Sequence, residues 1–484
     1  MPDAPVVETA SGSVRGRRTR GAVAFLGIPY AAPPFGPNRL RAPQPVSPWT
    51  GVRDATAYGP TVPKGEYSAP VRPLLPEITI PGEDCLNLNV WTPDPSAADL
   101  SAPDLSGPAR SGPGLSAAGL PVFVWIHGGS FTNGSGANAG YDGTAFARDG
   151  IVCVTINYRL GADGFLEVPG ADPNRGLRDM IAALTWVRDN IRAFGGDPGQ
   201  VTLAGESAGA MAIAALMSVP AARGLFARAV LQSGAASNVL TTAQAAQVSE
   251  RLTARLGVAA TRDAVAAAPL GQLVAAVTAL GLEIRVPGAA AEWGDLARLL
   301  PFAPVVDGEL LPRMPLDDAT GQVPAMIGTN RDEGRLFFVP GGVIDAIDDA
   351  GLARFAAGYG ITDLSAFAGA APGEVLCDVH TYVHFVQPAD QLARARGETP
   401  TWRYRFEGLD VTDNGGLGSC HAAEIPFVFG TAGLPQMRLL IGAHPSAAVA
   451  KTMHSTWVRF AATGDPGWAP GTTARLADKL VIVR

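Results

Sequence analysis

Apolar residues along the chain follow two different spacings. Continuous apolar runs, such as residues 121–126 and 151–158, are typical of strands buried on both faces of a sheet. Residues 175–191 instead place apolar residues at the spacing of an amphipathic helix. Strands that alternate with helices predict an α/β fold with a mostly parallel central sheet and helices on both faces. The predicted strands are 86–91, 121–126, 151–158, 201–205, 227–234 and 323–329.

Three segments interrupt this alternation. Residues 93–119 consist mostly of Pro, Gly, Ser and Ala, which predicts a mobile surface loop. Because the strands on either side of it are expected in the same sheet, we interpret it as a loop within one domain that spans 1–484. Two Ala- and Leu-rich segments, 241–282 and 342–376, predict helical excursions that cover the sheet.

Composition and charge exclude several classes of protein. The 484 residues are 47% hydrophobic and 17% charged, with a formal net charge of −7, so a large core is expected. The acidic balance argues against binding to nucleic acid or to an anionic membrane, because both require clustered Lys and Arg. The sequence contains no uninterrupted apolar run of about twenty residues and no apolar signal core near its start. We therefore expect a cytoplasmic protein without a membrane span.

The cysteines agree with this expectation. Cys85, Cys153, Cys377 and Cys420 are too few for a disulfide scaffold in a chain of this length. Their spacing contains no CxxC pair of the kind that binds zinc. We expect free, mostly buried thiols.

The sharpest chemical signal is Gly-Glu-Ser-Ala-Gly at 205–209, after a predicted strand and before a predicted helix. In this context the G-x-S-x-G pattern is typical of a nucleophile elbow, where a tight turn exposes the serine oxygen at the end of the sheet. Side chains two residues before and after the serine would collide, so both positions require glycine. The pattern alone would be weak in a chain with 58 glycines, and the flanking strand and helix make Ser207 a candidate nucleophile.

A second glycine-rich loop, Trp-Ile-His-Gly-Gly-Ser-Phe at 125–131, also follows a predicted strand. Small residues there let backbone N–H groups converge on the oxyanion of a tetrahedral intermediate. Together the two loops predict acyl-transfer chemistry rather than two ordinary turns.

These motifs and their surroundings resemble the type-B carboxylesterase and cholinesterase-like family, specifically its bacterial para-nitrobenzyl-esterase-like branch. The resemblance runs from residue 25 to residue 466, nearly the whole chain. The motifs that carry it are FLGIPYAAPP, EDCLNLNVWTP, VWIHGGSF, NYRLGADGFL, FGGDPGQVTLAGESAGA, LQSGA, IGTNRDEG, CHAAEIPFVFG and WVRFAATGDP, in that order.

The resemblance implies an α/β-hydrolase fold, with helical excursions over the active site, and a Ser–Glu–His triad. It assigns the nucleophile to Ser207, the acid to Glu333 and the base to His421. From the residues alone, Asp332 competes with Glu333, and His421 is one of six histidines. The chain order of nucleophile, acid and base is the one this fold uses.

The resemblance also assigns supporting residues. Backbone N–H groups of Gly129, Ser130 and Ala208 match the oxyanion hole, and Ser130 stands where relatives often carry Gly or Ala. The positions that surround the acid and the base are Glu206, Ser233 and Glu424. Cys85 matches a cysteine that forms a disulfide in secreted relatives, but no cysteine precedes it here.

Other residues have two readings. Phe131, Phe337 and Phe338 flank the candidate oxyanion loop and acid, so they belong either to an apolar substrate pocket or to the core. His380 and His384 have the i, i+4 spacing of a metal pair, but no HExxH accompanies them. We therefore expect a structural role for both histidines, no metal and no cofactor.

Three functions are compatible with this pattern. The first is hydrolysis of a small-molecule carboxylic ester by a monomeric serine carboxylesterase through an acyl-enzyme. The second is a specialised relative that uses the same serine, such as an acyltransferase, a lactone or carbamate hydrolase, or a cyclase. The third is a non-catalytic binding protein, which the presence of all three candidate triad residues disfavours.

Overall fold

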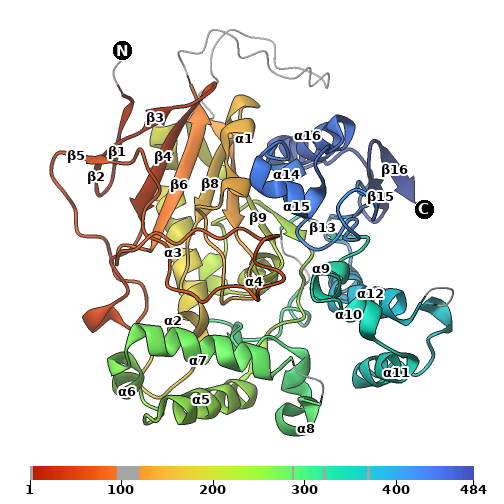
Figure 1. Cartoon of the computed structure of the whole chain (residues 1–484). Helices are drawn as coiled ribbons and strands as arrows, with labels where there is room; N and C mark the ends of the chain where they lie inside the picture. The colour runs from red at the N-terminus through yellow and green to blue at the C-terminus, as the bar shows by residue number, and fades with distance from the viewer. Residues whose placement is uncertain (1–3, 95–118, 286–287, 320–322, 368–370, 484) are drawn as a thin grey trace.

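The structure is a computed structural model that describes residues 4–94, 119–285, 288–319, 323–367 and 371–483. Within these ranges, eleven strands form the central sheet, in the order β16-β15-β14-β13-β10-β9-β7-β8-β6-β4-β3 (Figure 1). Their bounds are β3 Arg17–Arg18, β4 Ala22–Pro29, β6 Asn87–Pro93, β7 Leu120–Ile126, β8 Val152–Ile156, β9 Gly196–Glu206, β10 Arg228–Gln232, β13 Ala325–Asn330, β14 Thr401–Phe406, β15 Thr473–Leu476 and β16 Leu480–Val483.

The middle of this sheet is parallel and its edges are antiparallel. Strands β8, β7, β9, β10, β13, β14 and β15 pair in parallel, whereas β3, β4, β6 and β16 pair with their neighbours in antiparallel fashion. All six predicted strands are present, and the mostly parallel sheet is confirmed. Small separate sheets are formed by β1 Val6–Thr9, β2 Gly12–Arg15 and β5 Val52–Asp54, and by β11 Leu240–Thr241 with β12 Val305–Val306.

Sixteen α-helices lie within the described ranges, and the predicted helix 175–191 corresponds to α3. Their bounds are α1 Thr144–Arg148, α2 Gly161–Phe165, α3 Arg175–Asn190, α4 Ala208–Met217, α5 Thr242–Leu256, α6 Arg262–Ala267, α7 Leu270–Glu283, α8 Ala290–Trp293, α9 Arg335–Phe338, α10 Val343–Ala346, α11 Asp349–Gly358, α12 Pro372–Thr381, α13 Gln387–Ala395, α14 Ile425–Val428, α15 Arg438–Ile441 and α16 Ala447–Thr463.

Helices cover both faces of the sheet because its central strands are apolar on both sides. Along β7, Val122, Val124 and Ile126 pack into a core cluster that contains residues of α3, α4 and α13. The alternate residues Phe123 and Trp125 pack into a second cluster that contains residues of α1, α14 and α16. The prediction of helices on both faces is therefore confirmed.

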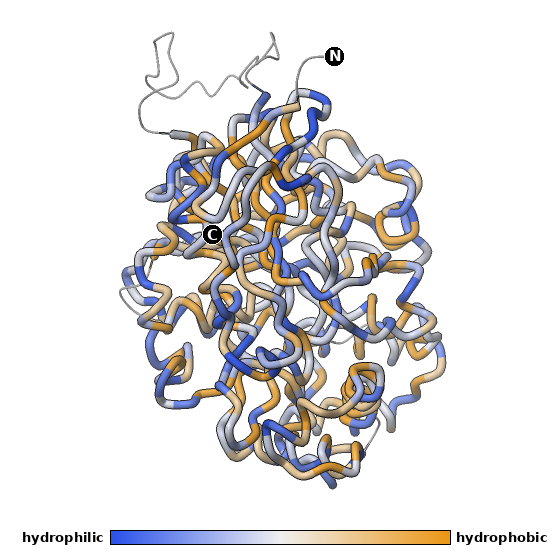
Figure 2. Tube along the Cα trace, turned by 90° about the vertical axis from the view of Figure 1, so that its left-hand side faces the viewer, coloured by the Kyte–Doolittle hydropathy of each residue, from blue (hydrophilic) through white to orange (hydrophobic). Residues whose placement is uncertain are grey.

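The two predicted helical excursions are also present. The segment 241–282 forms α5, α6 and α7, which lie at the lower end of the molecule in Figure 1. Helices α10 and α11 form within 342–376, and α12 begins there and continues to Thr381; all three lie to the right of the first group in the same view. Polar and apolar residues alternate along the helices at the bottom of Figure 2, as expected for helices with one buried and one exposed side.

The predicted loop 93–119 lies almost entirely outside the described residues. Strands β6 and β7 on either side of it belong to the same sheet, as predicted, with β8 between them. All four cysteines are buried free thiols, also as predicted. Among the helices of the described ranges, none combines the length and apolar character needed to cross a bilayer.

Candidate active site

Ser207 lies in a strained turn between β9 and α4. Its backbone has φ 53° and ψ −121°, values that a non-glycine residue rarely adopts. A Cβ atom at Gly209 would lie 2.1 Å from the carbonyl oxygen of Ile126, and one at Gly205 would lie 2.8 Å from the same oxygen. The glycines on both sides of the serine are thus required by close backbone approach, which confirms the steric argument made from the sequence.

The glycine-rich loop after β7 lies directly beside this turn. A Cβ atom at Gly128 would lie 3.1 Å from Cβ of Ser207. Gly129 has φ 110°, and its carbonyl oxygen accepts hydrogen bonds from the backbone N–H groups of Thr132 (3.0 Å) and Asn133 (2.9 Å). Ser130 follows at φ 55°. Gly129 and Ser130 therefore line the same cavity as Ser207, and Ala208 follows Ser207 as the first residue of α4.

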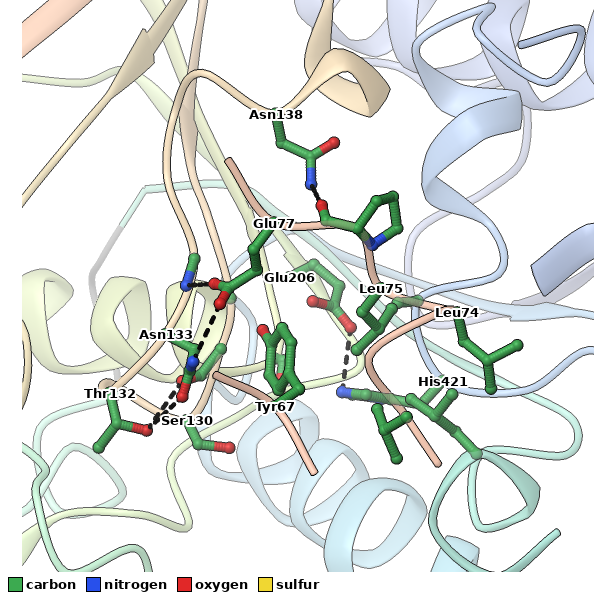
Figure 3. A pocket seen from close by; sticks show the side chains of 18 of the residues that line it. Tyr67, Leu74, Leu75, Glu77, Ser130, Thr132, Asn133, Asn138, Glu206 and His421 are labelled. Atoms are coloured by element: carbon green, nitrogen blue, oxygen red, sulfur yellow. Dashed lines mark hydrogen bonds and ion pairs between the residues drawn. The ribbon is translucent and has the colours of Figure 1, made fainter. Parts of the chain in front are cut away.

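His421 contacts two carboxylates, one at each ring nitrogen. Its Nδ1 lies 2.7 Å from Oε2 of Glu333. Its Nε2 lies 3.1 Å from Oε1 of Glu206 (Figure 3). Glu333 is fully buried, and its Oε1 accepts a hydrogen bond of 2.7 Å from the backbone N–H of Asn330. These contacts fix the Glu333 carboxylate against the imidazole.

Asp332, the alternative acid in the sequence, points elsewhere. Its carboxylate accepts hydrogen bonds from the guanidinium of Arg331 (2.9 Å) and from the backbone N–H of Ser419 (2.8 Å). The hydrogen-bond geometry thus separates the two adjacent acids, which the residues alone did not.

Glu424 and Ser233 are the other two residues expected around the acid and the base. Both residues are fully buried. Glu424 accepts hydrogen bonds from the side-chain amides of Asn330 (2.6 Å) and Gln232 (2.9 Å). Ser233 follows β10 and donates its backbone N–H to the carbonyl oxygen of Gly328 (2.8 Å). Asn330 and Gln232 were not singled out in the sequence, because only the folded sheet shows that they bind the same carboxylate.

The three buried acids change the protonation of this site. Burial, together with the charges of Glu424 and Glu333, raises the pKa of Glu206 to about 8, although His421 opposes the shift. Burial by itself would lower the pKa of His421, but Glu206, Glu333 and Glu424 raise it to about 9. Burial also raises the pKa of Glu424. Because Glu206 and His421 are in contact, they titrate as one coupled pair.

A cavity of about 220 Å³ opens onto Ser207 and His421. One wall is the segment 66–78, which contributes Tyr67, Leu74 and Leu75, labelled beside Ser130 and His421 in Figure 3. The rest of the lining comes mainly from the candidate oxyanion loop, α7, α9 and the segment that follows His421. Since apolar and polar residues both line the cavity, it is suited to an organic molecule with a few polar groups.

The segment 66–78 also contacts the glycine-rich loop. Oε1 of Glu77 accepts a hydrogen bond from the backbone N–H of Gly134 (2.5 Å), and Oε2 accepts one from the amide of Asn133 (3.1 Å) (Figure 3). The same amide donates to the carbonyl oxygen of Gly65 (2.7 Å). The sequence does not predict this wall, because the segment has no periodic pattern that would place it.

Of the three phenylalanines considered for the pocket, only Phe337 lines the cavity. Phe131 is fully buried and packs against Phe165, with ring centroids 4.9 Å apart. Phe338 packs against Phe355, with ring centroids 6.1 Å apart. Of the two possibilities left open by the sequence, Phe131 and Phe338 therefore lie outside the cavity lining and pack against other aromatic rings.

His380 and His384 belong to an aromatic cluster next to Phe337. The ring centroids of the two histidines are 4.3 Å apart, and Nε2 of His384 lies 2.9 Å from the hydroxyl of Tyr359. Burial lowers the pKa of both histidines, that of His384 to about 4. Both imidazoles are therefore neutral at pH 7 and pack within this aromatic cluster.

Comparison with known proteins identifies the family. A model of the carboxylesterase family matches residues 3–346 and 365–474 of the chain. The chain belongs to the carboxylesterase family. It is 37% identical over 477 residues to the para-nitrobenzyl esterase of Bacillus subtilis (strain 168). The aligned region covers 95% of this chain and 90% of that protein. It is 35% identical over 483 residues to the phenmedipham hydrolase of Pseudarthrobacter oxydans, covering 96% and 90%.

Comparison with solved structures supports the same family. A PNB esterase matches this carboxylesterase with a TM-score of 0.80 and 34% identity, covering 99% of this chain and 97% of the other. The carboxylesterase EST55 of Geobacillus stearothermophilus matches with a TM-score of 0.80 and 33% identity over the same shares. The chain therefore has the α/β-hydrolase fold and is a carboxylic-ester hydrolase of a family that works through a serine. The predicted family, fold and enzyme class are confirmed.

Proposed function

We propose that this carboxylesterase hydrolyses small-molecule esters through an acyl-enzyme on Ser207. Oγ of Ser207 attacks the ester carbonyl carbon while His421 accepts its proton, and the same proton then leaves with the alcohol. Water, deprotonated by His421, attacks the acyl carbon. The bond from the acyl carbon to Oγ of Ser207 then breaks, His421 returns the proton to Oγ, and the acid is released. Glu333 holds the imidazole in the required tautomer and stabilises the imidazolium.

The oxyanion forms beside the backbone N–H groups of Gly129, Ser130 and Ala208. A donor of this kind is typically worth about 3 to 4 kcal/mol in the transition state. The left-handed backbone of Gly129 and Ser130, close to Ser207, supports this role. Ser130 contributes through its backbone, so its hydroxyl is not required for oxyanion binding.

One observation carries the proposal. His421, which forms a hydrogen bond of 2.7 Å with the buried Glu333, lines the same cavity as Ser207, whose backbone has φ 53°. Nε2 of His421 contacts Glu206 in the structure, so this nitrogen must exchange Glu206 for Oγ of Ser207 in the reacting complex. Catalytic hydrogen bonds are often completed only when substrate is bound.

Turnover of 4-nitrophenyl butyrate by the purified protein tests the mechanism. We expect Ser207→Ala to lower kcat by about 10⁴- to 10⁶-fold, because the nucleophile is lost. Ser455→Ala, which removes an exposed hydroxyl on α16, serves as the matched control and should retain full activity. Covalent labelling of Ser207 by an organophosphate provides an independent readout.

The alternatives give different results. A non-catalytic binding protein would leave Ser207 unlabelled in folded protein. An acyltransferase or cyclase would be labelled but would give ester, amide or cyclic products when suitable acceptors are present. Mass spectrometry of the products with alcohol and amine acceptors separates these activities from hydrolysis.

We further propose a monomeric, cytoplasmic protein whose residues 1–484 form a single domain. The four buried free thiols support a reducing compartment. Size-exclusion chromatography with light scattering tests the oligomeric state, and a single cooperative unfolding transition tests the single domain.

A further inference from the structure

The charged side chains that line the cavity differ in whether they have partners. Glu66 forms an ion pair with Arg72, and Glu77 accepts hydrogen bonds from Gly134 and Asn133. Glu206 contacts His421. Each acid of the lining is thus satisfied by a neighbour within the protein.

Arg285 is different. It follows α7, lines the same cavity, and is the one Lys or Arg among the described lining residues. Its Nη2 lies 3.4 Å from Oγ of Ser130, a long hydrogen bond. Within the described parts of the chain, no carboxylate forms an ion pair with Arg285.

The charge of Arg285 also acts on its surroundings. Burial and, to a smaller extent, the positive charge of Arg285 lower the pKa of His384 to about 4. This charge contributes as well to the lowered pKa of His380. The Arg285 side chain is itself exposed at the cavity. A guanidinium that has no carboxylate partner gains free energy when an anion binds beside it.

We propose that Arg285 and the hydroxyl of Ser130 form a subsite for a carboxylate group of the substrate, next to the reacting ester. A guanidinium presents parallel N–H groups that match the two oxygens of a carboxylate, and the serine hydroxyl supplies a further donor. The substrate class is then an ester that carries a free carboxylate, on either its acyl or its alcohol part. This inference rests on the proposed function, because it assigns the substrate of the Ser207 site.

Two pairs of esters test the subsite and distinguish the two parts. The 4-nitrophenyl monoester of adipic acid and its neutral methyl ester carry the test group on the acyl part. The compounds 4-butyryloxybenzoate and methyl 4-butyryloxybenzoate carry it on the alcohol part. For each pair, the ratio of kcat/KM for the anionic ester to that for the neutral ester is measured at pH 7.5.

We expect Arg285→Gln to lower this ratio by about 10- to 100-fold for at least one pair, because a charge-assisted contact is lost. Arg285→Lys should keep part of the selectivity. High salt should reduce the ratio of the wild-type protein. Arg223→Gln, which removes an exposed positive charge outside the cavity lining, is the matched control and should leave the ratio unchanged.

The outcomes separate this inference from the mechanism. Because each ratio compares two esters on one protein sample, partial misfolding of a variant does not change it. Equal ratios in Arg285→Gln and wild type for both pairs would overturn the carboxylate subsite while leaving the esterase mechanism intact. If wild type and Ser207→Ala are equally inactive on the neutral esters, the proposed mechanism fails and the subsite with it.

Discussion

Nε2 of His421 lies 3.1 Å from Oε1 of Glu206, on the opposite side of the ring from Glu333. The imidazole therefore lies between two buried carboxylates, and Glu424 adds a third negative group nearby. The carboxylate of Glu206 favours the imidazolium, which stabilises the charge that develops as Ser207 reacts. The same carboxylate disfavours the neutral form of the imidazole, which is the form that must accept the proton of Ser207.

This arrangement predicts the effect of Glu206→Gln on the pH dependence. His421 accepts the proton of Ser207 only when the imidazole is neutral, so kcat/KM should rise with pH as the His421–Glu206 pair loses its proton. Glu206 raises the pKa of His421. Removing this carboxylate should therefore shift the acidic limb of the kcat/KM profile to lower pH, by about 1 to 3 units.

The measurement is kcat/KM for a neutral ester from pH 5 to pH 10, in buffers of constant ionic strength. Glu66→Gln removes another acid that lines the cavity but pairs with Arg72, so its profile should follow that of wild type. A limb that stays in place, or moves to higher pH, in Glu206→Gln would contradict the assigned coupling.

The adjacent acids Glu333 and Asp332 provide a second prediction. Glu333→Gln replaces the acceptor for Nδ1–H of His421 with an amide, which no longer stabilises the imidazolium. We expect kcat to fall by about 10⁴-fold with little change in KM. Asp332→Asn is the matched control, because Asp332 contacts Arg331 and Ser419 rather than the imidazole, and it should retain activity within about tenfold.

Steady-state kinetics on both variants, with circular dichroism to verify folding, tests this assignment. If Asp332→Asn lost as much activity as Glu333→Gln in folded protein, the acid would be assigned to the wrong residue.

A feature of the site could be predicted from the sequence where a short motif determines it, and not where it depends on contacts between residues far apart in the chain. The motif predicts the need for glycine at 205 and 209, and the fold adds the atom that a Cβ would meet at both positions, the carbonyl oxygen of Ile126 on the neighbouring strand β7. The partnership of Glu333 with His421 joins residues 88 positions apart, and only the family resemblance indicated it. The choice between Glu333 and Asp332 is visible in the hydrogen bonds of the fold and not in the spacing.

Other parts of the site depend entirely on tertiary packing. Phe131 follows the candidate oxyanion loop in sequence, but its backbone at φ 60° directs the ring into the core against Phe165. Tyr67 and Glu77 belong to a segment without secondary structure, whose position is fixed by contacts such as the Glu77–Gly134 hydrogen bond. The central sheet was easier to predict, because its buried strands are continuous apolar runs.

Glu77 supplies a third prediction. It holds Asn133 and Gly134, which end the turn that begins at Gly129. In Glu77→Ala the loop should lose its fixed position, so the N–H groups of Gly129 and Ser130 would no longer converge on the oxyanion. We expect kcat to fall by about 10- to 100-fold, less than the 10²- to 10³-fold typical of deleting a direct donor.

The readout is the split between kcat and KM for 4-nitrophenyl esters of several acyl lengths. A positioning role lowers kcat similarly for all of them, whereas a role in substrate binding would raise KM for some lengths only. Glu77→Gln, which keeps an acceptor oxygen for Gly134, should recover part of the loss.

The last prediction concerns a buried ion pair that supports the sheet. Arg159, just after β8, and Asp179, on α3, are almost fully buried and form two side-chain hydrogen bonds of 2.7 and 2.8 Å. The charge and hydrogen bonds of Asp179 outweigh burial and raise the pKa of Arg159. Asp179→Asn would leave the guanidinium buried without its counter-ion, which typically costs about 3 to 5 kcal/mol in the free energy of unfolding.

The exposed pair of Arg255 and Glu283 is the matched control, since a surface ion pair contributes about 0 to 1 kcal/mol. We expect the urea midpoint of Asp179→Asn to lie well below that of wild type, and that of Glu283→Gln to stay close to it. Equal midpoints for the two variants would mean that solvent or another acid compensates Arg159 after the change. Because Asp179 lies outside the cavity lining, any Asp179→Asn protein that remains folded should keep its kcat, which separates loss of stability from loss of catalysis.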